Sequence, residues 1–382
     1  MAKRPRVVIV YRVALQYRRR FYELLRGRLD GLGIDLVLVL GGPSASEARK
    51  RDYTPVPWAI QTRNKTMRLG GREVCWQPCL RYVHSADLVV VQPEARNLVN
   101  YVLLALQAAG RFRLAFWGVG VTQRRARPSN RLGEFAKRQM APWVHWWFAY
   151  TDRSARDVLS YGFPAERITV VNNAVDTQGL VAADELITDE EVRTFRGELG
   201  IEGHHVAISV GGMDEDKRVP FLLESCLLVR DNLPDFELIL IGAGPDQHLA
   251  ETYARTHSWI HYVGPVFDEA KVPYFRLAQL ALQPGNVGLV VLDCLALETP
   301  LITTAVPYHG PEIEYLSQGV NGLVVGDWTS PQAYAGAVVE AFNSPDLIDR
   351  LSEGCRASRG KYTLEGMVER FAKGVVLALE YE

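Results

Sequence analysis

The chain has 382 residues, of which 48% are hydrophobic and 23% charged, a composition that excludes bulk disorder and predicts a soluble globular protein of two domains. Its apolar runs are shorter than the roughly 20 residues that span a bilayer, and no secretory apolar segment follows the basic start. We therefore expect a cytoplasmic protein. The five scattered cysteines lack the spacing of a metal site and are predicted to be reduced thiols: Cys75, Cys79, Cys226, Cys294 and Cys355.

The net charge of −1 averages over an uneven distribution. Residues 1–180 contain 29 Lys or Arg and 13 Asp or Glu, whereas residues 181–382 contain 14 and 31. This asymmetry predicts an anionic partner for the first half, and nucleic acid, acidic polysaccharide and anionic lipid headgroups all fit. Solvated helix faces are the alternative. The basic residues form two clusters: Arg18, Arg19 and Arg20, and then Arg124, Arg125, Arg127, Arg131, Lys137 and Arg138.

Strand and helix patterns alternate along the first half. Residues 54–83 are expected to be irregular, Asp152 to cap a helix, and the polar run 173–204 to connect the two domains. The aromatic run 145–151 fits either a membrane-surface patch or, as we favour, a buried strand. The expected strands are 6–11, 34–40, 87–92, 113–117, 145–151 and 167–171, and the expected helices are 17–32, 97–109 and 152–161.

The second half repeats this alternation, so the sequence predicts two doubly wound parallel sheets in tandem, with the ligand crevice at their carboxyl edges. The glycines at 242–244 lack the third glycine of a dinucleotide fingerprint, which argues against a dehydrogenase. The expected strands are 205–210, 236–241, 259–264, 278–283, 301–305 and 322–325, and the expected helices are 220–233, 331–343, 346–354 and 363–379.

The stretch 284–300, PGNVGLVVLDCLALETP, predicts a strand end, a tight loop and a buried helix. Pro284 and Gly285 end an apolar run, and Gly288 allows a close turn before the helical pattern begins. A helix that starts there directs unpaired N–H groups and its positive end into the loop, which suits a phosphate or a sugar hydroxyl. An ordinary strand-to-helix turn is the simpler interpretation.

The order and spacing of several motifs across most of the chain resemble the family 4 retaining glycosyltransferases. This resemblance implies the GT-B fold, with domains at 1–180 and 181–362 and the final helix 363–379 returning to the first. The motifs are VVNNAVDT at 170–177, VGGMDEDKR at 210–218, IGAGPD at 241–246, HYVGPV at 261–266, PGNVGLVVLDCLALETPLIT at 284–303 and PEIEYLSQGVNGLVV at 311–325. QYRRRFYELL at 16–25, FWGVG at 116–120 and FAYTDRSA at 148–155 resemble a subgroup that builds bacterial surface polysaccharides.

The resemblance also implies roles for residues on the donor side. Negative charge develops on a nucleoside diphosphate as it leaves a sugar, so positive groups are needed there. Lys217 matches the Lys of a family Arg–Lys pair, whereas Gly212 stands at the Arg position; backbone N–H groups or a basic side chain of the first domain would have to compensate. The implied donor-binding residues are Gly211, Gly212, Lys217, Val263, Pro265, Val266, Gly285, Asn286, Val287, Gly288, Leu289 and Asp293.

Two of these positions depart from the family pattern. Gly285 stands where the family has a Glu that contacts the donor sugar, and Asp293 stands at the Glu that binds the ribose hydroxyls. On the acceptor side, Gly118 and Val119 occupy a motif in which Val119 replaces a His. Arg18 and Glu94 are further acceptor-side candidates, and Glu312 belongs to a recurring Pro-Glu pair without an inferred role.

We therefore predict a retaining glycosyltransferase that moves a sugar from a nucleotide-sugar, UDP favoured over GDP, to a glycan or lipid-linked acceptor. The alternatives are a UDP-sugar 2-epimerase-like enzyme and a non-catalytic partner protein of the same fold. No cofactor, metal or nucleic-acid partner is expected. Peripheral contact of the basic first domain with an anionic membrane is a further expectation.

Overall fold

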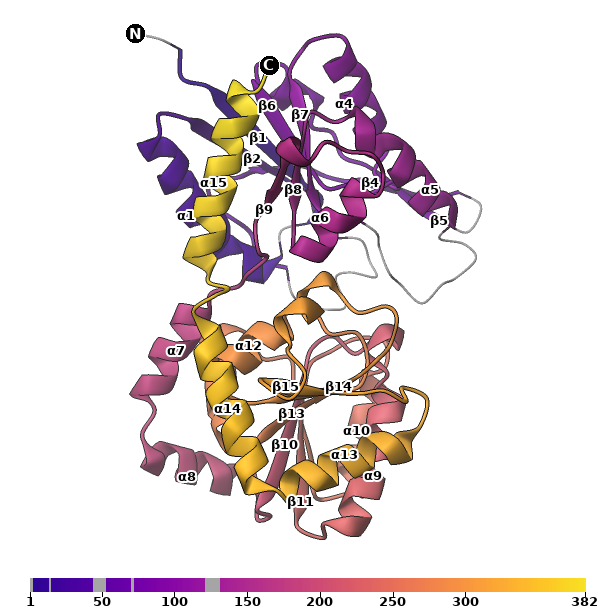
Figure 1. Ribbon diagram of the computed structural model, residues 1–382, viewed down its shortest axis with the longest axis vertical. Helices are drawn as coiled ribbons and strands as arrows, with labels where there is room; N and C mark the ends of the chain where they lie inside the picture. The colour runs from indigo at the N-terminus through magenta and orange to yellow at the C-terminus, as the bar shows by residue number, and fades with distance from the viewer. Residues whose placement is uncertain (1–2, 14, 44–52, 70–71, 121–130) are drawn as a thin grey trace.

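Two parallel sheets lie one above the other along the long axis of the molecule, each covered by helices on both faces (Figure 1). This computed structural model describes residues 3–13, 15–43, 53–69, 72–120 and 131–382. The chain completes most of the first domain before it enters the second. The alternation of strand and helix in the sequence has therefore produced the expected pair of doubly wound units.

Seven strands form the first sheet, in the order β3-β2-β1-β6-β7-β8-β9. The strands are apolar runs, as expected where helices cover both faces of a parallel sheet. The order reverses at β1, which pairs with both β2 and β6, so the carboxyl ends of these strands open a crevice toward the second domain. The strands are β1 Arg6–Tyr11, β2 Asp35–Leu40, β3 Ile60–Gln61, β6 Leu88–Val91, β7 Arg113–Gly118, β8 Trp146–Ala149 and β9 Ile168–Val170.

The helices of this domain are short. A 3-10 turn, η1 Gln16–Arg18, precedes the first helix, which begins two residues later than predicted. Thr151, not Asp152, caps α6, because Thr151 is the last extended residue and its hydroxyl accepts from the Ser154 amide. The helices are α1 Arg19–Gly31, α3 Leu80–Val83, α4 Val99–Ala108, α5 Arg131–Met140 and α6 Asp152–Leu159, with 3-10 turns η3 Ala141–Trp143 and η4 Ala165–Arg167.

The prediction that residues 54–83 are irregular was wrong. They contain β3, α3 and an antiparallel hairpin of β4 Lys65–Leu69 and β5 Arg72–Trp76. Much of β4 is charged or exposed, so it lacks the alternation of apolar and polar residues that marks a half-buried strand. In contrast, the buried strand predicted at 145–151 is confirmed over Trp146–Ala149, where the rings of Trp146 and Trp147 lie in the interior.

Six strands form the second sheet, in the order β12-β11-β10-β13-β14-β15. They are β10 His205–Val210, β11 Phe236–Ile241, β12 Ile260–Gly264, β13 Leu280–Gln283, β14 Leu301–Thr304 and β15 Gly322–Val325. All six agree with the predicted strands to within two residues. The connecting elements are η5 Glu215–Lys217, α9 Val219–Asn232, α10 Gln247–Thr256, η6 Asp268–Lys271, α11 Val272–Leu277, α12 Val290–Ala296, η7 Pro311–Tyr315, α13 Pro331–Phe342 and α14 Pro345–Arg359.

The segment predicted to be a polar connection, 173–204, is largely helical. It contains α7 Thr177–Leu186 and α8 Asp189–Glu198, and the predicted domain boundary at 180 falls inside α7. A capping box between Thr188 and Glu191 starts α8, and this signal was present in the sequence. Leu180 of α7 packs with Val272 and Ala296, so these helices belong with the second sheet.

The last helix, α15 Leu364–Glu380, lies against the first domain (yellow in Figure 1). Phe371 stacks on Phe148 of β8 with ring centroids 4.3 Å apart. A Cβ on Gly374 would lie 2.6 Å from the Thr169 hydroxyl oxygen and 2.7 Å from the Phe148 ring. The glycine therefore lets the helix approach the sheet closely.

Gly374→Ala is expected to lower the free energy of unfolding by about 1 kcal/mol or more, because the added methyl group overpacks this contact. Gly336→Ala is a matched control, since Gly336 is also helical but has open space around its Cβ. It should be neutral or stabilise the protein by about 0.5–1 kcal/mol. Denaturant unfolding measures both, and equal shifts would contradict the close approach of α15.

Candidate functional site

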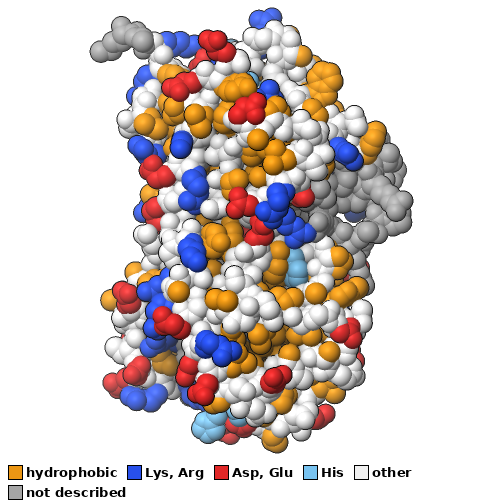
Figure 2. Space-filling view, viewed as in Figure 1, with side chains coloured by type: hydrophobic (Ala, Val, Ile, Leu, Met, Phe, Trp, Pro, Cys, Tyr) orange, Lys and Arg blue, Asp and Glu red, His pale blue; other side chains and the backbone are white. Residues whose placement is uncertain are grey.

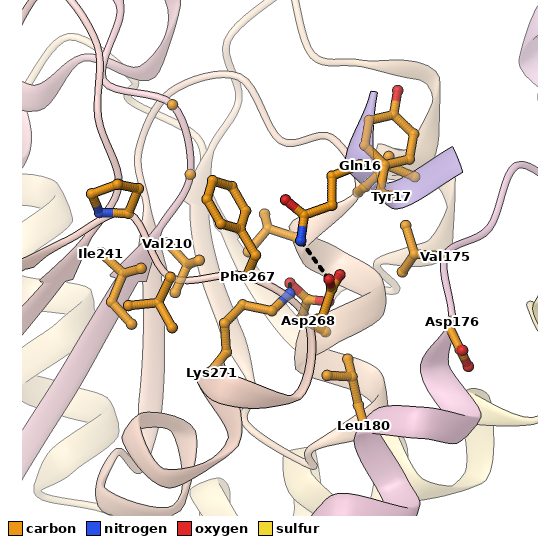
Figure 3. A pocket seen from close by; sticks show the side chains of 18 of the residues that line it. Gln16, Tyr17, Val175, Asp176, Leu180, Val210, Ile241, Phe267, Asp268 and Lys271 are labelled. Atoms are coloured by element: carbon orange, nitrogen blue, oxygen red, sulfur yellow. Dashed lines mark hydrogen bonds and ion pairs between the residues drawn. The ribbon is translucent and has the colours of Figure 1, made fainter. Parts of the chain in front are cut away.

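A cavity of about 530 Å³ lies between the two domains, at the carboxyl ends of the second sheet (Figure 3). The second domain contributes the residues that follow β10, β11 and β12, together with the start of α12. The first domain contributes η1 and the first turns of α1. Binding crevices in doubly wound folds form at this edge, where loops and helix starts converge.

Seven of the residues predicted for the donor side line this cavity: Gly211, Gly212, Lys217, Pro265, Val266, Leu289 and Asp293. The other five do not line it: Val263, Gly285, Asn286, Val287 and Gly288. Residues that the sequence analysis did not assign to the site also line it, among them Gln16, Phe267, Asp268 and Lys271 (Figure 3). Gln16 opens the QYRRRFYELL motif, whereas Phe267, Asp268 and Lys271 belong to none of the quoted motifs, and it is the fold that brings all four to the cavity.

Lys217 stands at the end of η5, between the cavity and the loop 284–289. Its ammonium group donates to the Asn286 carbonyl oxygen at 2.5 Å, and the Asn286 amide donates to the Asp216 carbonyl at 2.8 Å. A Cβ on Gly285 would lie 2.4 Å from the Asp216 carbonyl oxygen and 2.5 Å from the Lys217 carbonyl carbon. The loop that carries Lys217 therefore needs a glycine at 285 in order to lie this close.

The side chain of Asn286 points into the loop network and holds the backbone. Its amide oxygen accepts from the Gly310 amide at 2.6 Å. The helix after this loop, α12, has only seven residues, and its Val291 and Leu292 amides donate to Gly288 and Leu289. The predicted set of unpaired N–H groups is therefore smaller than expected, since short-range bonds already use two of them.

His309 fixes the same loop from behind. It is buried, its Nδ1 accepts from the Val287 amide at 3.0 Å, and its Nε2 donates to the Thr304 carbonyl at 2.7 Å. Burial lowers the pKa of His309 to about 4. The neutral ring, protonated on Nε2, is therefore the form that holds the loop.

Acid should destabilise this loop through His309. The pKa of His309 is lower in the folded than in the unfolded protein, so protonation favours unfolding. The free energy of unfolding therefore falls as the pH drops from about 6.5 toward 4, and His309 adds no pH dependence above that range. The expected loss from His309 between pH 7.5 and 5 is about 2 kcal/mol. Denaturant unfolding of the wild type and of His309→Gln at both pH values tests this. The two proteins differ only at residue 309, so the difference in their pH dependence comes from His309. Equal pH dependence in both proteins would contradict it.

Asp293 lies one turn into α12 with its side chain only 9% exposed. Its Oδ2 accepts from the Lys271 ammonium at 2.6 Å, and both residues line the cavity. The pair places a carboxylate and an ammonium group side by side. Such a pair can accept hydrogen bonds from hydroxyl groups and donate to an anion.

The four acceptor-side candidates do not line this cavity. Arg18 is fully buried, donates to the Asn173 side-chain oxygen and lies 4.9 Å from the Trp117 ring. Glu94 pairs with Arg12 at 3.1 Å and Arg96 at 3.0 Å. Burial raises the pKa of Glu94, but the two arginines outweigh it and bring the pKa below its ordinary value.

Gly118 ends β7, where a Cβ would lie 2.8 Å from the Pro93 ring, and Val119 follows it as a half-buried residue. The Pro-Glu pair at 311–312 now has a structural explanation. The carboxylate of Glu312 is buried and accepts from the Asn173 side-chain amide at 2.5 Å. Since Asn173 also accepts from Arg18, this chain of polar side chains connects the two domains at their junction.

The described residues contain neither a cluster of metal-ligand side chains nor a membrane-spanning helix. Among the described residues, no three His, Cys, Asp or Glu side chains lie together as metal ligands would. Within the same part of the chain, each helix is either too short or too polar to span a bilayer. On the face shown in Figure 2, basic and acidic side chains are interspersed over both domains.

Comparisons with known proteins place this geometry in context. Residues 204–344 match a family model described as glycosyl transferases group 1. The chain is 25% identical over 210 residues to a Bacillus subtilis protein named as a glycosyltransferase, YtcC, with 51% of each chain covered. It is 23% identical over 185 residues to the alpha-monoglucosyldiacylglycerol synthase of Acholeplasma laidlawii, covering 47% of this chain and 45% of that one. The match thus spans about half the length of these relatives.

Similarity of structure extends over nearly the whole chain. The crystal structure of Anabaena Alr3699/HepE in complex with UDP superimposes with a TM-score of 0.71 at 14% identity, covering 97% of this chain and 99% of the other. At this identity the likeness establishes the fold. Residues 204–344 of the second domain are therefore similar to the glycosyl transferases group 1 family, within a chain that has the two-domain GT-B fold.

Proposed function

We propose that this protein is a retaining glycosyltransferase that uses a nucleotide-sugar donor, UDP-linked in preference to GDP-linked. One observation carries the proposal: Lys217 and Asp293 line the same cavity at the sheet edge, inside the segment that matches the glycosyl transferases group 1 model. Lys217 would face the leaving diphosphate and Asp293 the ribose hydroxyls. The complex of the Anabaena structure with UDP supports the choice of nucleotide.

The chemistry follows from what the cavity offers. Breaking the bond between sugar and diphosphate places negative charge on the phosphate oxygens, and a fixed cation there lowers the barrier. The motif position that holds a His in the resembling family is Val119 here, which offers no acid or base. The leaving diphosphate itself would therefore accept the proton of the acceptor hydroxyl, on the same face of the sugar.

We further propose a glycan or lipid-linked acceptor at the cytoplasmic membrane surface. The excess of Lys and Arg in residues 1–180 supports an anionic surface as partner. Two aromatic side chains beside the second basic cluster are exposed, Phe135 at 61% and Trp143 at 71%, and Arg138 is exposed on the same helix. Residues 124–127 of that cluster lie outside the described residues, as do the side chains of Arg131 and Lys137. One relative is named for the synthesis of a glycolipid.

Calorimetry with UDP, GDP and their sugars tests the proposal. We expect UDP to bind more tightly than GDP, and a UDP-sugar to be consumed faster when the native glycan is present. Lack of binding by all of these nucleotides would favour the non-catalytic alternative. Conversion of the donor to its 2-epimer, without transfer, would favour the epimerase. The proposed reaction needs no metal, so EDTA should leave turnover unchanged.

A further inference from the structure

Lys217 supplies one positive charge to the cavity, but its domain lacks the second positive charge that the resembling family has. Gly212 lines the cavity at the place where the resembling family has an arginine, so this position supplies no charge. Lys271 also lines the cavity, but its ammonium group is paired with Asp293 at 2.6 Å. A nucleoside diphosphate would therefore lack a second cation if the second domain alone formed the site.

The first domain presents two guanidinium groups to the same cavity. Arg19 and Arg20, the first residues of α1, both line it, and their side chains are 51% and 56% exposed. They share one carboxylate, Glu23, which lies 3.0 Å from Arg19 and 3.8 Å from Arg20. Two positive charges against one negative charge leave a positive excess at this wall.

The local structure explains why these two arginines face outward. The preceding residue, Arg18, is fully buried and is held by Asn173. Successive side chains on a helix are about 100° apart, so anchoring Arg18 in the interior turns the next two toward the crevice. The positive end of the 13-residue helix α1 lies at the same place and adds to the attraction for an anion.

A contact across the cleft holds this wall in position. The Gln16 amide, in the turn before α1, donates to the Asp268 carboxylate of the second domain at 2.5 Å (Figure 3). Asp268 follows directly on Pro265, Val266 and Phe267, which line the cavity. The start of α1 is thus fixed against the loop that follows β12 and lines the cavity.

We propose that Arg19 and Arg20 form the second half of the diphosphate site, in place of the arginine that is missing at Gly212. The inference rests on the proposed function and goes further, because it makes the donor a bridge between the domains. Guanidinium groups suit this task since they bind phosphate oxygens in a bidentate manner. Glu23 would release them when the phosphate enters.

Calorimetry of the full-length protein with UDP and with UMP tests this assignment. The Arg19→Ala/Arg20→Ala double variant should bind UDP at least tenfold more weakly, while its affinity for UMP should change by less than twofold, since UMP lacks the β-phosphate. Arg19→Lys/Arg20→Lys should recover part of the UDP affinity. Arg26→Ala/Arg28→Ala is the matched control, because it removes two charges from the same helix outside the cavity.

Four results would overturn the proposal. UDP binding by the Ala double variant equal to that of the wild type would remove both arginines from the site. An equal loss for UDP and UMP, or the same loss in the control, would reveal a general charge effect instead of contact with the β-phosphate. Absence of UDP and GDP binding by the wild type would overturn the proposed function together with this inference. Thermal unfolding of each variant confirms that it is folded.

Discussion

Lys217→Ala is expected to lower turnover by well over tenfold, because it removes the cation that would stabilise the leaving diphosphate. The effect should fall on kcat and kcat/KM alike, since the charge develops mainly in the transition state. Steady-state kinetics with a nucleotide-sugar and its acceptor measure it. An unchanged rate would remove Lys217 from the site.

Lys217 also donates to the Asn286 carbonyl, so loss of the hydrogen bond must be separated from loss of charge. Lys217→Arg retains the charge and should lose less activity than Lys217→Ala. Lys373→Ala is a control on the exposed face of α15 and should leave the rate unchanged. Melting temperatures of all three variants show whether the loop or the chemistry is affected.

Gly285→Glu is expected to lower turnover by about a hundredfold or more. This is expected although the substitution introduces the residue that the family pattern has at this position. The Cβ alone would lie 2.4 Å from the Asp216 carbonyl oxygen and 2.5 Å from the Lys217 carbonyl carbon. These are backbone atoms, so the loop would have to move and carry Lys217 with it. Activity assays and the melting temperature of the variant measure the effect.

The matched control is Gly326→Ala, since no atom lies within 4 Å of a Cβ at that position. It should leave both turnover and the melting temperature near the wild-type values. A Gly285→Glu protein that is as active as the wild type, or more so, would show that the loop can yield. In that case the glycine would not be required for the position of Lys217.

Most strands of the two sheets could be predicted because a parallel strand that is buried on both faces is an apolar run, whatever its partners are. β11 Phe236–Ile241 is an example, with all six residues buried. The hairpin β4–β5 was missed because the described side chains of β4 are exposed and β5 is only five residues long, with no clear alternation of polar and apolar residues. Helix α8 was missed because its residues are mainly polar, although its capping box was readable. Half of the residues of α7 are apolar, but Leu180 packs against Val272 and Ala296, which are distant in the sequence.

The candidate site divides in a similar way. Lys217 and Asp293 could be assigned because each belongs to a contiguous motif with a fixed distance to its strand. Lys271 and Gln16 could not be assigned, because their partners are distant in the sequence. Lys271 and Asp293 are 22 residues apart, and Gln16 and Asp268 are 252 residues apart. The hydrogen bond between the Asn286 side chain and the Gly310 amide could not be predicted for the same reason, because Gly310 comes from a separate loop.

The sequence by itself therefore determined the fold class, the two-domain order and the cavity edge at which Lys217 and Asp293 stand, because these depend on apolar periodicity and on short motifs. Only the tertiary structure decided which further side chains share that cavity. It buried Arg18, placed Arg19 and Arg20 on the wall of the cavity that Lys217 also lines, and brought the backbone of Asp216 against Gly285. Contacts between distant segments depend on how the domains pack, and that packing leaves no local pattern in the chain.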